Sequence, residues 1–150
     1  MSTAAPALPP LVVESTLLGR LEVPATRVLT FTAGLPGFDG LRRFVLVATQ
    51  GEGLHWLQSV EDASLSFLLA DPFRFVEGYT IELPAADLAA LGPVADAEPP
   101  LVLAVAVIER GMTGTLNLQG PIVINPATRR ARQVIFPESP WGMAYPAVLG

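Results

Sequence analysis

The sequence predicts an all-β, mainly antiparallel protein that folds as a small β-barrel-like domain with one short surface helix near residues 84–91. Three observations predict this fold class. Apolar residues recur in many short runs, of a length typical of strands. Turn-forming residues separate these runs at regular spacing, as in barrels and sandwiches. The 150 residues are 51% hydrophobic, so a chain of this length can bury a core without disulfide bridges.

The N-terminal part of the chain contains two expected strands. Residues 1–14 are rich in Pro and Ala and are expected to form a flexible extension, which leaves 15–150 as a single domain. Apolar and polar residues alternate over 17–23, which predicts a strand, and 28–31 predicts a second one. The next segment, 33–40, holds three Gly and one Pro, which indicates an irregular turn.

The most informative stretch comprises residues 56–73. Two apolar, strand-like pieces, 54–57 and 65–70, flank a polar insert. The stretch ends with Asp71-Pro72, a dipeptide that favours a turn. We expect the insert to be a loop or bulge that water or a partner can reach. Its polar residues are Gln58, Ser59, Glu61 and Asp62.

One later segment has the signals of a helix. Residues 84–91 begin with Pro, contain strong helix formers and are followed by Gly92. A helix this short is unstable alone in water, so we expect Leu88 and Leu91 to dock it on the domain. The continuously apolar run 101–108 favours a strand covered on both faces. Further strands are expected at 43–48, 73–76, 79–81, 116–118, 122–125 and 131–136, and the tail from 137 is expected to be irregular.

Acidic residues are concentrated in the middle of the chain. Residues 50–100 hold nine acidic residues and one arginine, whereas the net charge of the whole chain is −5. Such a region disfavours direct binding to nucleic acid, which needs cations to neutralise phosphates. It is compatible with a basic protein partner. A solvated acidic face without a partner is the simpler interpretation of the same charges.

The residue types that common active sites need are scarce. The chain has one His and no Cys. It therefore has too few ligands of the kind that transition-metal sites use, and it has no thiol that could act as a nucleophile. It has no Gly-x-Ser-x-Gly elbow and no phosphate-binding loop. Glu61 and Asp62 are adjacent, so on a strand they would point to opposite faces rather than form a hydrolytic pair. We therefore expect no enzymatic activity, no cofactor and no metal.

The sequence also favours a cytoplasmic protein that is monomeric when free. Its longest unbroken apolar run, 101–108, is far shorter than the roughly 18 residues that a membrane-spanning helix needs. A secretory signal has basic residues before its apolar segment, whereas no basic residue precedes the first apolar residues of this chain.

A second polar stretch follows the apolar run. It comprises residues 117–126, with Asn117 near its start and Asn125-Pro126 at its end. Asn125 is typical of turn and capping work through side-chain to backbone hydrogen bonds. The arginines that follow form either a solvated hairpin tip or part of a binding surface; they are Arg129, Arg130 and Arg132.

Several motifs occur in order along the chain. They are Phe31-x-x-Gly34-Leu35-Pro36-Gly37-Phe38, Arg43-Phe44, Trp56-Leu57-Gln58-Ser59-Val60-Glu61-Asp62, Asp71-Pro72, Asn117-Leu118-x-x-Pro121-Ile122-x-Ile124-Asn125 and Arg132-Gln133. Taken together, these motifs resemble the flagellar assembly factor FliW family over about residues 18–136. The chain departs from the family pattern at its two ends and at Gln119-Gly120.

This resemblance implies a β-barrel-like domain without enzymatic activity that binds two proteins. One is CsrA, a small basic RNA-binding dimer; binding prevents it, by an allosteric effect away from its RNA groove, from repressing translation of flagellin mRNA. The other is flagellin, which competes with CsrA. Excess flagellin in the cytoplasm would then release CsrA and stop flagellin synthesis.

The resemblance and the acidic middle of the chain lead to an expected docking surface. Glu61, Asp62 and Asp71 are expected to face CsrA, and an apolar groove near Leu35, Phe38 and Ile124 is expected to bind flagellin, although Phe38 is also expected to support the fold. The candidate protein-binding residues are Gln58, Glu61, Asp62, Asp71, Phe38, Asn117, Ile124 and Asn125.

Two other functional classes remain open at this point. The main alternative is a small-molecule-binding β-barrel domain in which His55, Trp56 and Gln58 line a pocket. The third class is a hydrolase of unknown type.

Overall fold

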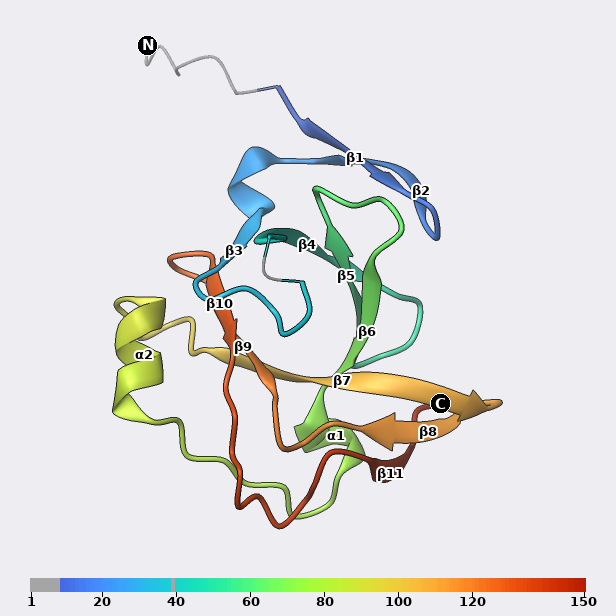
Figure 1. The fold of residues 1–150 in the computed structure, drawn as a ribbon, viewed down its shortest axis with the longest axis vertical. Helices are drawn as coiled ribbons and strands as arrows, with labels where there is room; N and C mark the ends of the chain where they lie inside the picture. The colour runs from blue at the N-terminus through green and yellow to red at the C-terminus, as the bar shows by residue number, and fades with distance from the viewer. Residues whose placement is uncertain (1–8, 39) are drawn as a thin grey trace.

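The computed structural model describes residues 9–38 and 40–150 of the chain. Most of the elements within these residues are strands (Figure 1). The strands are β1 (Leu11–Ser15), β2 (Gly19–Val23), β3 (Leu29–Phe31), β4 (Arg43–Ala48), β5 (Leu54–Ser59), β6 (Ser66–Ala70), β7 (Leu101–Arg110), β8 (Thr113–Leu116), β9 (Ile122–Asn125), β10 (Arg130–Gln133) and β11 (Tyr145–Val148). The helices are the 3-10 helix η1 (Ala25–Arg27), α1 (Pro72–Phe75) and α2 (Ala85–Leu91).

The strands from β3 to β7 close into a barrel with β9 and β10. Neighbours around the ring are β7, β6, β5, β4, β3, β10 and β9, and β9 pairs again with β7. The pairs are antiparallel except for β3 and β10, which are parallel. Because the ring is closed, each of these seven strands has a hydrogen-bonded neighbour on both sides. No strand of the ring therefore presents a free edge that could pair with another chain. The predicted all-β, barrel-like fold is confirmed.

β7 is long enough to belong to two structures at once. Its first residues pair with β9 and its middle with β6, which completes the barrel. Its last residues, from Ala106, pair with β8, and β8 pairs with β11. The strands β8 and β11 therefore extend away from the barrel below β7, with α1 beside them (Figure 1). The sequence predicted this strand only over 101–108 and predicted none in the tail.

The N-terminal hairpin lies outside the barrel. β1 and β2 pair only with each other, from Leu11 opposite Val23 to Ser15 opposite Gly19. The expected flexible extension 1–14 is therefore wrong for its last residues, 11–14, which are part of β1; residues 1–8 lie outside the described part of the chain. β1 was missed because the Pro-rich composition before Leu11 conceals the alternation of buried and exposed side chains that begins there.

The predicted surface helix is confirmed as α2, but the expected strand at 73–76 is wrong. That segment is helical because Asp71 caps it: the Asp71 carboxylate accepts a hydrogen bond from the Phe73 N–H at 3.0 Å, and Pro72 fits the first turn. The expected strand at 79–81 is absent too, since residues 77–84 form no regular element.

Two buried clusters fill the molecule, and a third anchors α2. Phe31, Phe44 and Leu57 belong to the cluster inside the barrel. A second cluster, which includes Leu116, lies between β7, β8, β11 and α1. The small third cluster joins Leu91 of α2 to β9. β9 is therefore buried along its whole length, with the barrel core on one face and α2 on the other.

The side chain of Gln58 ties three separate segments together. It is fully buried on β5, and its carbonyl oxygen accepts hydrogen bonds from the hydroxyls of Ser15 on β1, at 2.6 Å, and Ser66 on β6. Its amide group donates to backbone oxygens of the 59–65 loop, including Ser59 O at 3.0 Å and Asp62 O at 3.3 Å. A buried polar group is tolerated only when its hydrogen bonds are satisfied in this way. Gln58 is therefore a structural residue, and the expectation that it contacts a partner is wrong.

Replacing Gln58 with Leu should destabilise the protein by about 3 kcal/mol, because it leaves buried hydroxyl and carbonyl partners without hydrogen bonds. Urea unfolding followed by tryptophan fluorescence would measure the loss. The matched control is Gln50→Leu, at an exposed turn position, which should change stability by less than about 0.5 kcal/mol. Equal stability of the two variants would contradict this role for Gln58.

Candidate functional site

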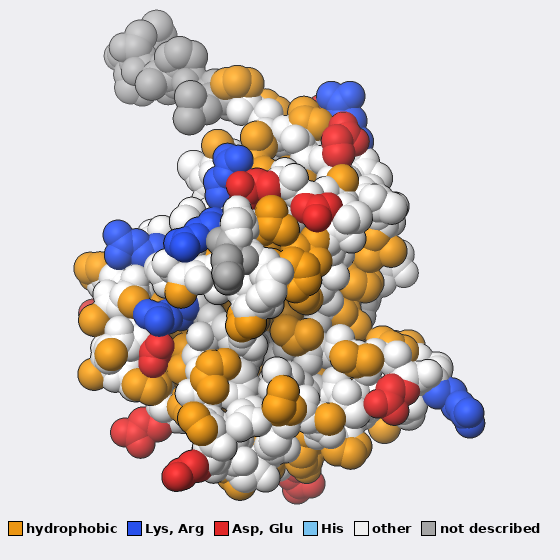
Figure 2. Space-filling view, viewed as in Figure 1, with side chains coloured by type: hydrophobic (Ala, Val, Ile, Leu, Met, Phe, Trp, Pro, Cys, Tyr) orange, Lys and Arg blue, Asp and Glu red, His pale blue; other side chains and the backbone are white. Residues whose placement is uncertain are grey.

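An open apolar groove lies where the 35–38 turn approaches the segments that follow β8 and β10. Its volume is about 460 Å³. Its floor includes the buried side chains of Leu57 and Ile122. Its rim includes large apolar side chains that are unusually exposed for their type, with exposed fractions of 37% for Phe38, 54% for Ile135 and 67% for Met143. Apolar side chains gather across the centre of this face, with most charges toward its periphery (Figure 2).

Phe38 is attached to the barrel core by a chain of aromatic contacts. Its ring packs edge-on against Phe67 of β6, with 5.7 Å between the ring centroids. Phe67 contacts Phe44, and Phe44 packs edge-on against Phe31 at 5.1 Å. Backbone hydrogen bonds from Phe38 N to Leu35 O and from Leu41 N to Phe38 O close the turn at 2.8 and 2.9 Å. The sequence-predicted residue Phe38 is thus both a groove residue and a support for the turn.

Amide side chains form the polar part of the groove. The carbonyl oxygen of Asn117 accepts hydrogen bonds from the backbone N–H groups of Gln119 and Gly120, both at 3.1 Å. The amide group of Gln133 donates to Gly120 O at 2.9 Å. These bonds fix the 117–120 turn and place Asn117, one of the predicted residues, in the lining.

The 59–65 loop presents the acidic pair at the same end of the barrel. Oε1 of Glu61 accepts hydrogen bonds from the backbone N–H groups of Arg42 and Arg43, both at 2.9 Å. These bonds lower the pKa of Glu61. The Asp62 carboxylate accepts from the hydroxyl and the N–H of Ser64, which lowers its pKa as well. Both groups are therefore ionised at neutral pH and held in place.

Asp71 does not belong with the acidic pair. β5 and β6 form a hairpin in which Gln58 lies opposite Ser66 at the loop end and Leu54 opposite Ala70 at the other end. Asp71 follows Ala70, so it lies at least roughly 14 Å along the strand from the loop. Asp71 is therefore not a neighbour of Glu61 and Asp62, and its part in an acidic docking surface stays a prediction.

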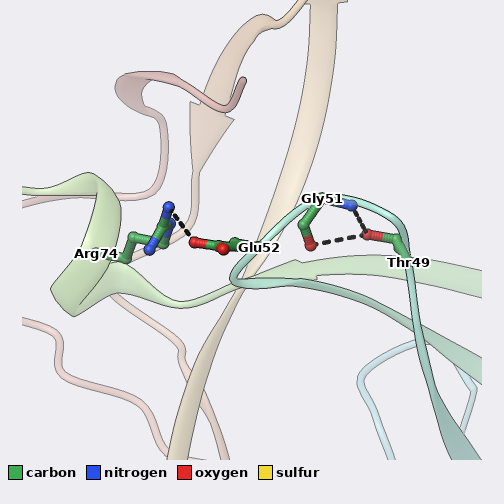
Figure 3. Close-up of polar contacts among 4 residues, drawn as sticks. All are labelled: Thr49, Gly51, Glu52 and Arg74. Atoms are coloured by element: carbon green, nitrogen blue, oxygen red, sulfur yellow. Dashed lines mark hydrogen bonds and ion pairs between the residues drawn. The ribbon is translucent and has the colours of Figure 1, made fainter.

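The surroundings of Asp71 are structural. Asp71 caps α1, and Arg74 of the same helix forms a 2.8 Å ion pair with Glu52 in the β4–β5 turn (Figure 3). The Thr49 hydroxyl donates to Gly51 O and accepts from Gly51 N, which closes that turn. Both ion-pair partners are substantially exposed, so the pair contributes little stability.

Two other predicted residues are buried and are corrected here. Ile124 is 1% exposed within the barrel core, so it does not line the groove. Asn125 is fully buried, and its amide group donates to Leu91 O, Gly92 O and Pro93 O at 3.1, 3.2 and 2.9 Å. It therefore caps the C-terminal end of α2, in agreement with the capping role considered from the sequence.

Sequence reasoning missed most of the groove lining, including the large apolar side chains of Phe67, Ile135 and Met143. Phe67 was assigned only to a strand, and Ile135 was placed in an expected strand that ends earlier, at Gln133. Met143 lies in the tail, where no pattern predicts its position. The detectable signal was Ile135, a large apolar residue two positions after Gln133, but its exposure follows from the end of β10 at Gln133.

The residues of the small-molecule alternative do not come together in this groove. His55 and Trp56 are half-buried on β5, and Gln58 is engaged in the hydrogen bonds described above. Among residues 9–38 and 40–150, no group of three or more His, Cys, Asp or Glu side chains could hold a metal ion. Over the same residues, no helix is long and apolar enough to cross a membrane.

Comparison with known proteins gives consistent matches along most of the chain. A family model described as FliW protein matches residues 12–147. The flagellar assembly factor FliW of Natranaerobius thermophilus is 35% identical over 130 residues, which cover 85% of this chain and 86% of that protein. The one from Symbiobacterium thermophilum is 39% identical over 126 residues, or 82% and 91% of the two chains. A crystal structure of the flagellar assembly factor FliW has a TM-score of 0.81 at 28% identity and covers 89% of this chain and 94% of its own.

The two asparagines of this region should respond differently to replacement by aspartate. Asn125→Asp should destabilise the protein by about 3 kcal/mol or more, because a buried carboxylate would face three carbonyl oxygens. Asn117→Asp should be nearly neutral, because Asn117 uses only its carbonyl oxygen as an acceptor. Thermal unfolding at pH 7 compares the two. An Asn117→Asp variant that is as unstable as Asn125→Asp would show that these hydrogen bonds are assigned wrongly.

Proposed function

Because the chain belongs to the FliW family, we propose that it is a non-enzymatic flagellar assembly factor that binds CsrA, antagonises its repression of flagellin mRNA translation, and is released from CsrA by flagellin. The structural observation that best supports this proposal is the proximity of the anchored acidic loop to the apolar groove. Two chemically different surfaces at one end of the barrel suit two different protein partners.

The acidic loop has the properties of a surface for a basic partner such as CsrA. The Glu61 and Asp62 carboxylates are ionised, and hydrogen bonds to the backbone restrain them before binding. A restrained charge loses less conformational entropy when it meets its partner. Both bonds to Glu61 use Oε1, which leaves Oε2 available for an arginine or lysine.

The groove has the properties of a surface for an apolar helix face. Its rim side chains Phe38, Ile135 and Met143 are large, apolar and exposed, and its floor is already packed. An amphipathic helix binds such a groove through apolar residues spaced three or four positions apart. We assign the groove to flagellin on this basis.

Overlap of the two surfaces accounts for competition between the partners. Glu61 is bonded to the backbone of Arg42 and Arg43, directly after the turn that carries Phe38. A stable protein interface covers about 800 Å² on each partner, an area that extends well beyond a groove of this size. A protein seated on Phe38 would therefore cover part of the acidic loop as well.

Neutralising the acidic loop should slow association with CsrA. The double variant Glu61→Gln/Asp62→Asn keeps the hydrogen-bond acceptors and removes two charges, so we expect a several-fold lower association rate and a weaker salt dependence, with little change in dissociation. Stopped-flow fluorescence over a salt series measures both rates.

The matched control for this experiment is Asp96→Asn/Glu98→Gln, which removes two charges from the segment between α2 and β7. It should behave like the wild-type protein. If the association rate of the wild-type protein does not fall as salt rises, electrostatic steering by the loop is wrong.

A charge introduced on the groove rim should weaken flagellin binding. Met143→Lys places a cation where an apolar helix would sit, and we expect at least a tenfold increase in Kd for flagellin, equivalent to about 1.4 kcal/mol. Val148→Lys is the control, since Val148 is 64% exposed on β11 and does not line the groove. Phe38→Ala should also weaken binding, with some loss of stability from the lost contact with Phe67. Equal flagellin affinity in isothermal titration for both lysine variants would refute the assignment of the groove.

A further inference from the structure

A second groove lies between two segments that have no regular structure. It is formed by residues 79–82, which follow α1, and residues 135–141, which follow β10. The two segments come together at the lower edge of the molecule (Figure 1). The groove has a volume of about 490 Å³. Neither partner surface described above uses it, apart from Ile135, which lies where the two grooves meet.

The walls of this groove are built from aromatic rings and prolines. The rings of Tyr79 and Trp141 pack against each other in a tilted arrangement, with 5.6 Å between their centroids and 54° between their planes. Further edge-on contacts hold this pair: Phe73 packs on Tyr79 at 5.0 Å, and Tyr145 packs on Trp141 at 5.7 Å. The aromatic wall is therefore fixed before any ligand arrives. The remaining apolar lining includes Phe136, Pro137 and Pro140.

The aromatic pair can also donate hydrogen bonds. None of the hydrogen bonds within the described residues uses the Tyr79 hydroxyl or the Trp141 indole N–H. A tyrosine hydroxyl is protonated at neutral pH and can donate, and burial raises the pKa of Tyr79 further. Aromatic side chains with free donors are typical of grooves that bind polyproline II segments, whose backbone carbonyls are not bonded internally.

The composition of the walls disfavours the other common mode of peptide binding. An added β-strand needs backbone N–H groups along the edge that it joins. Pro137 and Pro140 have none, and the Phe136 N–H is already bonded to Gln119 O at 2.7 Å. Recognition through side chains therefore suits this groove better than extension of a sheet.

The rim of the groove carries two acidic residues that have no ionic partner among the described residues. Glu82 and Glu138 are both exposed, one on each of the two segments, and neither takes part in the ion pairs of the protein. Carboxylates on both sides of an aromatic groove complement a ligand with basic residues next to its prolines. We propose that this groove binds a proline-rich, arginine-flanked peptide segment of a protein partner in the polyproline II conformation.

Binding of synthetic peptides to the full-length protein tests the proposal. The probe is a fluorescein-labelled peptide, Arg-Pro-Leu-Pro-Pro-Leu-Pro-Arg, compared by fluorescence anisotropy with one peptide in which alanines replace the prolines and another in which glutamines replace the arginines. We expect at least a tenfold weaker affinity for the alanine peptide, because it must lose more conformational entropy on binding. The glutamine peptide should bind several-fold more weakly than the probe.

Variants of the protein locate the binding site. Glu82→Lys/Glu138→Lys should bind the arginine-flanked probe at least tenfold more weakly and the glutamine peptide with unchanged affinity, while Glu77→Lys/Glu109→Lys, which changes two exposed acids outside the groove, should match the wild-type protein. Trp141→Phe keeps an aromatic ring at this position and removes the indole donor, so it should weaken the binding of both peptides several-fold.

The proposal is overturned if the wild-type protein binds the probe no better than the alanine peptide. It is overturned too if both double variants bind the probe equally well. Met143→Lys, which tests the flagellin groove, should leave probe binding unchanged, so failure of one assignment is distinguishable from failure of the other.

Discussion

The buried carboxamide of Gln58 is the interaction on which the arrangement of this end of the barrel depends. It holds β1 through Ser15, β6 through Ser66 and the 59–65 loop through the loop's backbone oxygens. A backbone bond from Thr16 N to Ala63 O at 2.9 Å joins the hairpin to the same loop. Glu61 then extends the connection to the start of β4. The acidic pair is therefore held by a continuous set of hydrogen bonds that starts in the core, and disruption of its buried end would release its exposed end.

β7 determines where the grooves can form. The first half of β7 pairs within the closed barrel and its second half pairs with β8, so the two sheets diverge at Ala106. The turn 117–120 and the segment that leaves β10 cross this divergence, and their side chains cover it only partly. Exposed apolar residues such as Ile135 and Met143 remain at that position. The grooves thus follow from topology, whereas the residues that line them determine which chemistry they suit.

Local patterns predicted most of the barrel strands and the surface helix, because period-2 alternation and turn residues act over a few positions; β1, β11 and the segment 73–81 were not predicted correctly. Local patterns could not predict contacts between residues that are far apart in sequence. Gln58 looked like an exposed loop residue because its partner Ser15 is 43 residues away. Ile124 was expected to be accessible to a partner because the short sequence of β9 does not reveal that both faces of this strand are covered. Asp71 was expected to lie near Glu61 because the two residues are close in sequence. In the structure β6 separates them, so they lie at opposite ends of the β5–β6 hairpin. The helix α1 depends on the Asp71 carboxylate that caps it. In the sequence this single residue is a weaker signal for a helix than the two phenylalanines that follow are for a strand.

The rigidity of the barrel bears on how two ligands would influence each other. Every strand of the ring is hydrogen-bonded on both sides, and the aromatic contacts from Phe31 to Phe38 fix the groove turn to its interior. A large conformational change within such a closed structure would require the loss of many bonds at once. Competition at this end of the protein is therefore better explained by overlapping contact areas than by a switch in its shape. Ile135 contributes to both grooves. Ligands bound in the two grooves would therefore interfere with each other where both contact this side chain.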